Sequence, residues 1–343
     1  MNKKWLIGLL CSITLLLLFA CGTSDNDNVE NQTDPEAEQG DETEANGGET
    51  TVYRIGASQF VEHPSLDAAY EGFKAAIADA GLEVEYDLQS AQADQSNTAT
   101  IAQNFVADNV DLIFANATPS AQSALQATSD IPIVFTSVTD AIGAGLVEAM
   151  DQPGENITGV MDMHPDAIIE TVNFIDTYFS GSAVGLIYNA GEQNSVAQVD
   201  SVTAAIEGTS LSTIERTIST SAEVQQAATS LVGEADVIYI VTDNTVVSAL
   251  ESVVGVANDQ DIPLIVGEPD SLERGGFATF GIDYYTIGYR AGEMAVEILT
   301  GERVPSEIDV EYPPEMQLYL NEAAAEEQGI EWNSDWDELA ELQ

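Results

Sequence analysis

Two short apolar runs, residues 112–115 and 131–135, each stop abruptly in small polar residues. Runs of this length and composition are typical of buried strands in a parallel sheet. Ligands of open parallel sheets bind at the carboxyl ends of the strands, so we expect the polar residues there to lie together on one rim. These residues are Asn116, Thr118, Thr136 and Ser137.

Strand-like and helical segments alternate from residue 51 onward, and the same alternation starts again near residue 165. Such alternation predicts parallel sheets covered by helices on both faces. Because 343 residues are too many for one ordinary core, we predict an α/β fold of two doubly wound parallel-sheet lobes joined by a three-segment hinge. Lobe one should hold residues 52–158 and 284–304, and lobe two residues 159–283 and 305–343.

The Thr118-Pro119 pair is typical of a helix start, with Thr as the N-cap and Pro as the first helical residue. The unpaired N–H groups of a helix start attract anions, so a ligand carboxylate is expected here. The alternative is that Thr118 and the neighbouring Ser and Thr residues only cap helices and close turns.

In lobe two, three strand-like runs end in residues that could bind a ligand: Tyr188 with Asn189, Asp243 with Asn244, and Glu268. They should face Gln59, Phe60 and the polar rim of lobe one. One acid opposite hydroxyls and amides suits a zwitterion, with its ammonium on Asp243 and its carboxylate on lobe one. Asp243 could instead serve as the N-cap of the following helix, or do both.

The first residues, with Lys3 and Lys4 before an apolar run that ends in small residues, are typical of a signal peptide, predicted as residues 1–20. The sequence around Cys21 resembles a bacterial lipobox, which implies a lipid on that residue. Residues 22–51 contain ten acidic and no basic residues, so we expect residues 21–51 to form a tether. After cleavage no second cysteine remains for a disulfide, because Cys11 leaves with the signal peptide.

The chain has 59 acidic and 8 basic residues, and a formal net charge of −51. Such a surface repels nucleic acid and anionic membranes, and salt screens its self-repulsion. We interpret it as the adaptation of a halophilic extracellular protein; attraction of cationic ligands is the rival explanation.

Motifs for catalysis, metal binding or a cofactor are absent from the sequence. It contains no G-x-S-x-G, no phosphate-binding loop and no His/Cys/carboxylate cluster with metal spacing. His63 and His164 both precede Pro at expected helix starts, which favours a turn role, although His63 lies close enough to Gln59 to line a pocket. We therefore expect no enzyme and no bound cofactor.

Residues 132–160 combine a strand with an Asp-x-x-x-x-Gly-Leu-Val segment and a Pro-Gly-x-Asn-Ile-Thr-Gly-Val segment. The residues concerned are Asp140, Gly145, Leu146, Val147, Pro153, Gly154, Asn156, Thr158, Gly159 and Val160. This combination resembles ABC-transporter substrate-binding lipoproteins, a family with tryptophan- and tyrosine-binding members, although Ala141 stands where Pro is usual. Further segments around Gln59, Asn116 and Asp243, and at residues 321–329, extend the resemblance over about residues 52–340.

This resemblance implies a type I periplasmic-binding fold and the delivery of a small solute, such as an aromatic amino acid, to an ABC permease. It also implies anchoring through Cys21 on the outer face of the membrane, and we expect a monomer. Phe60 and Tyr188 would then offer aromatic surfaces to the ligand. One rival class is a lipid-anchored sensor domain that presents its ligand to a membrane receptor; an α/β enzyme is another, but the sequence shows no nucleophile for it.

Overall fold

The computed structural model describes residues 51–342. The predicted signal peptide, Cys21 and the tether up to residue 50 lie outside this part of the chain. Among the described helices, none combines the length and apolar character needed to cross a membrane.

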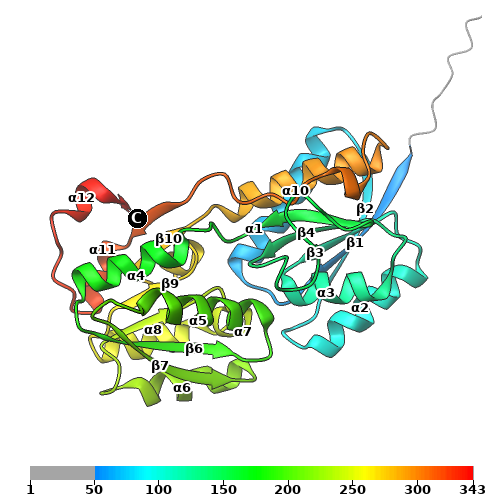
Figure 1. Cartoon of the computed structure of the whole chain (residues 1–343). Helices are drawn as coiled ribbons and strands as arrows, with labels where there is room; N and C mark the ends of the chain where they lie inside the picture. Colours follow the sequence, from blue (N-terminus) through cyan, green and yellow to red (C-terminus); the bar gives the residue numbers. More distant parts are fainter. Residues whose placement is uncertain (1–50, 343) are drawn as a thin grey trace, which may run out of the picture. The chain divides into compact units, whose positions relative to one another are not determined.

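Lobe one is built on a five-stranded parallel sheet with the strand order β2-β1-β3-β4-β5 (Figure 1). Its strands are β1 (Val52–Gln59), β2 (Glu83–Ser90), β3 (Leu112–Asn116), β4 (Ile133–Val138) and β5 (Ile157–Met161). Its helices are α1 (Pro64–Asp79), α2 (Gln95–Ala107), α3 (Thr118–Ala127) and α10 (Tyr284–Leu299), followed by the 3-10 turn η2 (Pro305–Glu307).

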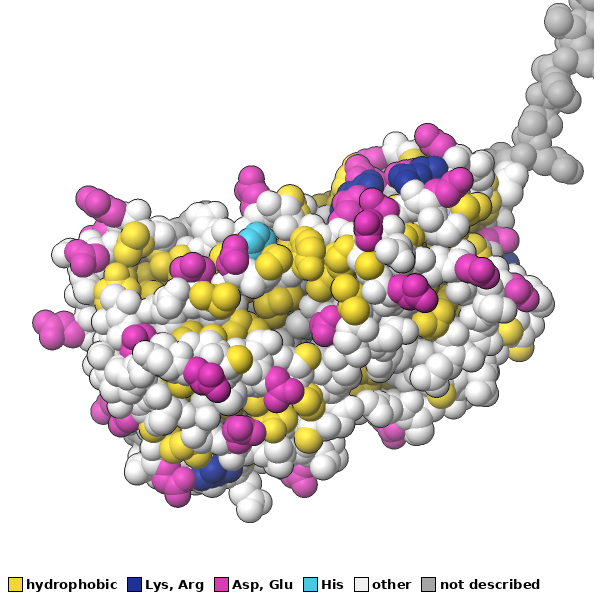
Figure 2. All heavy atoms as spheres, viewed as in Figure 1, with side chains coloured by type: hydrophobic (Ala, Val, Ile, Leu, Met, Phe, Trp, Pro, Cys, Tyr) yellow, Lys and Arg dark blue, Asp and Glu magenta, His cyan; other side chains and the backbone are white. Residues whose placement is uncertain are grey.

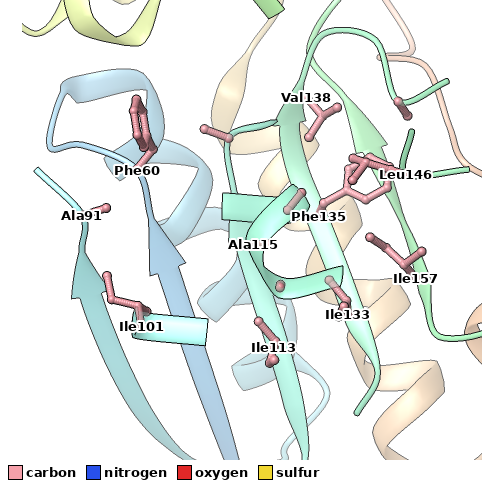
Figure 3. Close-up of a cluster of buried hydrophobic side chains, with 14 of the residues drawn as sticks. Phe60, Ala91, Ile101, Ile113, Ala115, Ile133, Phe135, Val138, Leu146 and Ile157 are labelled. Atoms are coloured by element: carbon pink, nitrogen blue, oxygen red, sulfur yellow. The ribbon is translucent and has the colours of Figure 1, made fainter. Parts of the chain in front are cut away.

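Helices cover both faces of this sheet, because successive side chains of a strand point to opposite sides. Ile113 packs with Ile133 and Phe135 in the cluster that includes side chains of α2 and α3 (Figure 3). Phe114, the next residue, packs with side chains of α1 and α10 in a separate cluster. The predicted doubly wound arrangement is therefore confirmed in lobe one.

Helix α10 returns to lobe one because glycines let it approach α1 closely. A Cβ atom on Gly288 would lie 1.9 Å from the carbonyl oxygen of Ala69, and one on Gly72 would lie 2.1 Å from that of Tyr285. Only residues without a side chain fit at these contacts. The packing of α1 on α10 thus fixes where the second crossing between the lobes ends.

Lobe two is built on a seven-stranded sheet with the order β12-β11-β10-β9-β8-β6-β7. Its strands are β6 (Ala183–Asn189), β7 (Ser212–Ile218), β8 (Val237–Ile240), β9 (Leu264–Val266), β10 (Ala278–Gly281), β11 (Gln317–Leu320) and β12 (Glu341–Leu342). Its helices are α4 (Ala167–Tyr178), α5 (Gln193–Ile206), α6 (Val224–Leu231), α7 (Asn244–Val247), α8 (Leu250–Asp259), α9 (Asp270–Glu273), α11 (Glu322–Glu327) and α12 (Trp336–Leu339), with the 3-10 turn η1 (Ser221–Glu223).

The sequence had suggested a fully parallel sheet in lobe two, but one pair of its strands is antiparallel. Strand β11 pairs antiparallel with β10, whereas all the pairs among β6 to β10 are parallel. The chain enters β11 directly from the hinge and not through a crossover helix of the same lobe, so nothing imposes the parallel direction on it.

The last crossing begins later in the chain than the sequence had suggested. Residues 305–311 remain on lobe one, where Thr158 donates a hydrogen bond to the carbonyl oxygen of Ile308 at 2.6 Å. Glu311 forms an isolated parallel bridge with Val160 of β5, and Arg290 of α10 binds both of its carboxylate oxygens at 2.9 Å. Strand β5, up to Met161, also belongs to lobe one, because it pairs with β4.

Candidate functional site

The carboxyl ends of β1, β3 and β4 lie side by side and are joined by side-chain hydrogen bonds. Asn116 donates to Gln59 Oε1 at 3.3 Å and to the carbonyl oxygen of Leu66 at 2.8 Å. Its Oδ1 accepts a hydrogen bond from the hydroxyl of Ser137 at 2.7 Å. Gln59 and Asn116 are thereby fixed behind Ser137, which lines the cavity described below.

Backbone strain occurs at two positions on this rim. Ala117 and Ser137 have φ values of 88° and 58°, in a region that residues with side chains rarely adopt. Ser137 also lies within an irregularity of the β4–β5 pairing, between Phe135 and Val138. Strain of this kind is stable only where the surroundings enforce it, and it concentrates at ligand-binding sites.

Thr118 is not the N-cap of α3. Ala117 occupies that position, without a side-chain cap, and Thr118 is the first helical residue. The hydroxyl groups of Thr118 and Thr136 are fully buried, and neither has a hydrogen-bond partner in the described part of the chain. Because buried polar groups are nearly always satisfied, these hydroxyls leave hydrogen-bonding capacity at the rim.

Asp243 has the capping role that the sequence left open, and it also lines the cavity described below. It is the N-cap of α7, where its carboxylate accepts a hydrogen bond from the backbone N–H of Val246 at 2.8 Å. The other oxygen accepts one from the N–H of Asn189 at 2.6 Å. Asp243 is fully buried yet lines the cavity, and this burial raises the pKa of its carboxyl group above the ordinary value.

Glu192, which the sequence analysis missed, lies directly behind this turn. One of its oxygens accepts hydrogen bonds from the backbone N–H and the side-chain amide of Asn244, at 3.2 and 2.7 Å. The other accepts from the N–H and the hydroxyl of Thr245, at 3.0 and 2.6 Å. Burial, and to a lesser extent the neighbouring Asp243, raises the pKa of Glu192 to about 7.

Glu268 connects the two lobes. Its carboxyl group forms hydrogen bonds with the hydroxyl of Ser65 in α1 of lobe one and with that of Ser271 in α9 of lobe two. The side chain is buried, and burial raises its pKa to about 7. The nearby guanidinium of Arg274 is engaged by Glu251 at 2.8 Å, so Glu268 has no direct cationic partner among the described residues.

A small, nearly closed cavity lies where these groups meet, between the lobes; the space around it measures about 270 Å³, part of it open to solvent. It is lined by His63, Leu66, Ser137, Asp162, Thr242, Asp243, Asn244, Val247, Glu268 and Tyr284. Three of these residues are acids, and none of the described residues on the cavity wall is Lys or Arg. The buried carboxyl groups are therefore unbalanced by protein cations, which favours a positively charged group in the cavity.

His63 and Asp162 complete the wall of this cavity. His63 Nε2 lies 3.5 Å from Asn244 Oδ1 across the lobes, and His63 Nδ1 has no partner in the described part of the chain. Burial lowers the pKa of His63 to about 4, so the ring is neutral at pH 7. Asp162 accepts a hydrogen bond from the hydroxyl of Tyr284 at 3.0 Å, and burial raises its pKa to about 6.

Several of the expected residues do not line this cavity. Phe60 is buried in the core of lobe one, so its ring is not available for stacking (Figure 3). The Tyr188 hydroxyl binds Glu215 at 2.8 Å instead, and Asn189 supports Asp243 through its backbone. Of the expected residues, the structure places four on the cavity wall: Ser137, Asp243, Asn244 and Glu268.

Among residues 51–342, no group of three or more His, Cys, Asp or Glu side chains is arranged to hold a metal ion. Two α/β lobes joined by three crossings, with a cavity formed at the carboxyl ends of their strands, define a two-lobed solute-binding protein of the type I periplasmic-binding class.

The family model described as ABC transporter substrate binding protein matches residues 54–341. The protein thus belongs to this family of solute-binding proteins, which are not enzymes, as its sequence had led us to expect. It is 41% identical over 314 residues to a tyrosine-binding protein of Clostridioides difficile, with 89% of this chain and 86% of that protein aligned.

Two solved structures are informative neighbours. A crystal structure from Streptococcus pneumoniae of an ABC domain in complex with L-Trp superposes with a TM-score of 0.80 at 31% identity, covering 85% of this chain and 99% of the other. The ligand-free, open structure of a substrate-binding protein with adhesive properties from Clostridium difficile gives 0.62 at 38% identity, with the same coverage of 85% and 99%.

Proposed function

We propose that this protein binds an aromatic amino acid between its lobes and delivers it to an ABC importer. One observation carries the assignment of an amino acid: Asp243 is fully buried beside the cavity, whose described wall provides carboxyl groups but no Lys or Arg. A ligand ammonium supplies the missing positive charge. The tyrosine-binding relative and the L-Trp complex support the aromatic side chain.

In this proposal the ligand's ammonium lies near Asp243, and its carboxylate lies towards Ser137. Ser137 lines the cavity, and Thr118 and Thr136, whose hydroxyls have no partner among the described residues, belong to the same ends of β3 and β4. The N-terminus of α3 adds partial positive charge there. Donors on lobe one and an acid on lobe two thus set the orientation of a zwitterion.

The arrangement of the lobes supports ligand binding between them. Lobe one contacts lobe two through Ser65 and Glu268, and through Thr139 and Thr242, whose hydroxyl oxygens are 3.4 Å apart. The chain also superposes more closely on the L-Trp complex than on the open, ligand-free neighbour, although the latter is more similar in sequence. We infer that the described arrangement is the closed one.

Delivery requires that the protein stay near its permease. We propose that a lipid on Cys21 anchors it to the outer face of the membrane and that the acidic segment after Cys21 acts as the tether. Membrane fractionation of the wild type and of Cys21→Ala tests this step, since only the wild type should remain with the membrane and incorporate a labelled lipid.

A thermal-shift screen of the common amino acids, followed by calorimetry, tests the ligand assignment. A ligand that binds only the folded protein raises its melting temperature. We expect tyrosine or tryptophan to give the largest shift and acidic amino acids none. Equal or larger shifts with neutral sugars would contradict the proposal, and binding without ligand uptake by cells that carry the permease would favour a sensor.

A further inference from the structure

A second hollow lies directly beside the ligand cavity. This groove encloses about 1030 Å³, part of it open to solvent, and receives residues from both lobes. Most of its wall consists of α4 and α5 side chains, including Ile168, Ile169, Ala204 and Ala205. Figure 2 shows hydrophobic side chains across the middle of this face, with acidic side chains scattered around them.

One layer of side chains separates the groove from the ligand cavity. Thr139 and Gln198 line the groove, whereas Thr242 lines the cavity. Gln198 Nε2 donates to Thr242 Oγ1 at 2.7 Å and to Thr139 Oγ1 at 3.5 Å, and Gln198 Oε1 accepts from the Thr242 backbone N–H at 3.1 Å. All three residues are buried, and the layer connects lobe two to lobe one.

We propose that Gln198 limits the length of the ligand, by closing the cavity on the side of the groove. The proposal rests on the proposed function, because it concerns the size of the amino acid that the same cavity accepts. A smaller side chain at position 198 joins the cavity to the groove and admits an amino acid extended by one apolar residue. The extension then lies between Ile168, Ile169 and the alanines of α5.

The chemistry of the groove selects an apolar extension. Its wall carries Met163 and the two isoleucines, and Ile169 is 50% exposed. Burying such a side chain against a leucine-sized group removes apolar surface of both from water, which favours binding. Asp140 is the acid on the described wall of the groove, so an extension that ends in a second negative charge should be disfavoured.

Calorimetry with L-tyrosine, L-tryptophan and the dipeptides leucyl-tyrosine, tyrosyl-leucine, leucyl-tryptophan and tryptophyl-leucine tests the proposal. The wild type should bind a free amino acid at least about 100-fold more tightly than any of the dipeptides. In Gln198→Ala, the affinity for at least one dipeptide should rise by about tenfold or more. Gln198→Asn, which keeps the amide but shortens the side chain, should show a smaller gain.

Two controls distinguish dipeptide binding in the groove from a gain in affinity caused by a general loosening of the site. Ser201 lines the groove one helical turn away and bonds only within α5, to the Ala197 carbonyl oxygen at 2.8 Å, so Ser201→Ala should bind like the wild type. Adding Ile169→Asp to Gln198→Ala should abolish the gained dipeptide binding and leave amino-acid binding in place.

The outcomes distinguish this inference from the proposed function. If the wild type binds none of the amino acids, the proposed function is wrong and the inference falls with it. If the wild type binds dipeptides as tightly as free amino acids, Gln198 sets no limit. The inference alone is wrong if folded Gln198→Ala and Gln198→Asn proteins bind the amino acid and gain no dipeptide affinity.

Discussion

Ser65 of lobe one and Glu268 of lobe two share a hydrogen bond that crosses the cleft, at a carboxyl group buried from solvent. Burial raises the pKa of Glu268 from the ordinary 4.5 to about 7. Between these two pH values, the folded protein therefore holds a proton that the unfolded chain has released. The contribution of Glu268 to stability is greatest below about pH 4.5 and is lost as the pH rises through about 7.

Replacing Glu268 by Gln should remove this pH dependence. We expect the melting temperature of Glu268→Gln, measured relative to the wild type, to be higher at about pH 8 than at about pH 5. Glu331 is exposed, so Glu331→Gln serves as the control and should show no such difference. If the difference in melting temperature between the wild type and Glu268→Gln stays constant across this pH range, Glu268 is not the source of the pH dependence.

Asp243→Ala tests the ammonium site. Loss of the counter-charge of a desolvated ammonium should weaken ligand binding by about 2–5 kcal/mol, measured by calorimetry. Asp94 is an exposed N-cap of α2, so Asp94→Ala should lose about 1 kcal/mol of stability and keep full affinity. Affinity of Asp243→Ala within about threefold of the wild type would leave Asp243 with only its capping role.

Glu192→Ala should destabilise the protein severely, because it leaves the donors of Asn244 and Thr245 buried without an acceptor. Each such donor costs about 1–3 kcal/mol. Glu192→Gln keeps one acceptor oxygen and should lose less, in both the free energy of unfolding and ligand affinity. Denaturant titration measures the free energy of unfolding. If Glu192→Ala is as stable as the wild type, Glu192 does not support the site.

Two glycine substitutions in helices should have opposite effects on stability. Gly288→Ala places a Cβ atom 1.9 Å from the carbonyl oxygen of Ala69 and should destabilise the protein by at least about 1–3 kcal/mol. Gly255 lies on α8, where an added Cβ atom would meet no other atom within 4 Å, so Gly255→Ala should stabilise by up to about 1 kcal/mol. Denaturant unfolding of both variants checks this, and equal effects would contradict the close packing of α1 on α10.

Salt should stabilise the protein, because the region after the tether has 49 acidic residues (59 minus the 10 of the tether) and only 6 basic ones (8 minus Lys3 and Lys4). At low ionic strength the screening length grows and the carboxylates repel one another over larger distances. The melting temperature should rise steadily from dilute buffer to about 1 M NaCl. A flat curve over this range would count against adaptation to saline surroundings.

The sequence was sufficient to predict the alternation of strands and helices, because hydrophobic periodicity is a local property of the chain. It did not reveal the antiparallel direction of β11 or the attachment of residues 305–311 to lobe one. Both depend on contacts between segments distant in the sequence, such as Thr158 with Ile308.

Within the site, the rule that polar residues follow strand ends correctly indicated Ser137, Asp243, Asn244 and Glu268 as residues of the cavity wall, although their part in binding remains a prediction. Asp162 follows β5 in the same way and could have been found by the same rule. Glu192 could not, since nothing local distinguishes it from the many exposed acids of this chain. Phe60 illustrates the opposite problem, because an aromatic residue just beyond a strand can complete the core instead of facing a ligand.

The salt bridge between Arg290 and Glu311 ties α10 to the segment that crosses to lobe two last. Together with the backbone hydrogen bonds of Glu311 to Gly159 and Met161, it holds the third crossing segment on lobe one as far as Glu311, which leaves residues 312–316 to reach β11. The other two crossings are also short: residues 162–166 follow β5, and residues 282–283 precede α10. Because motion between two lobes is absorbed by a few residues between elements, any opening of the cleft has to be taken up within these three short segments.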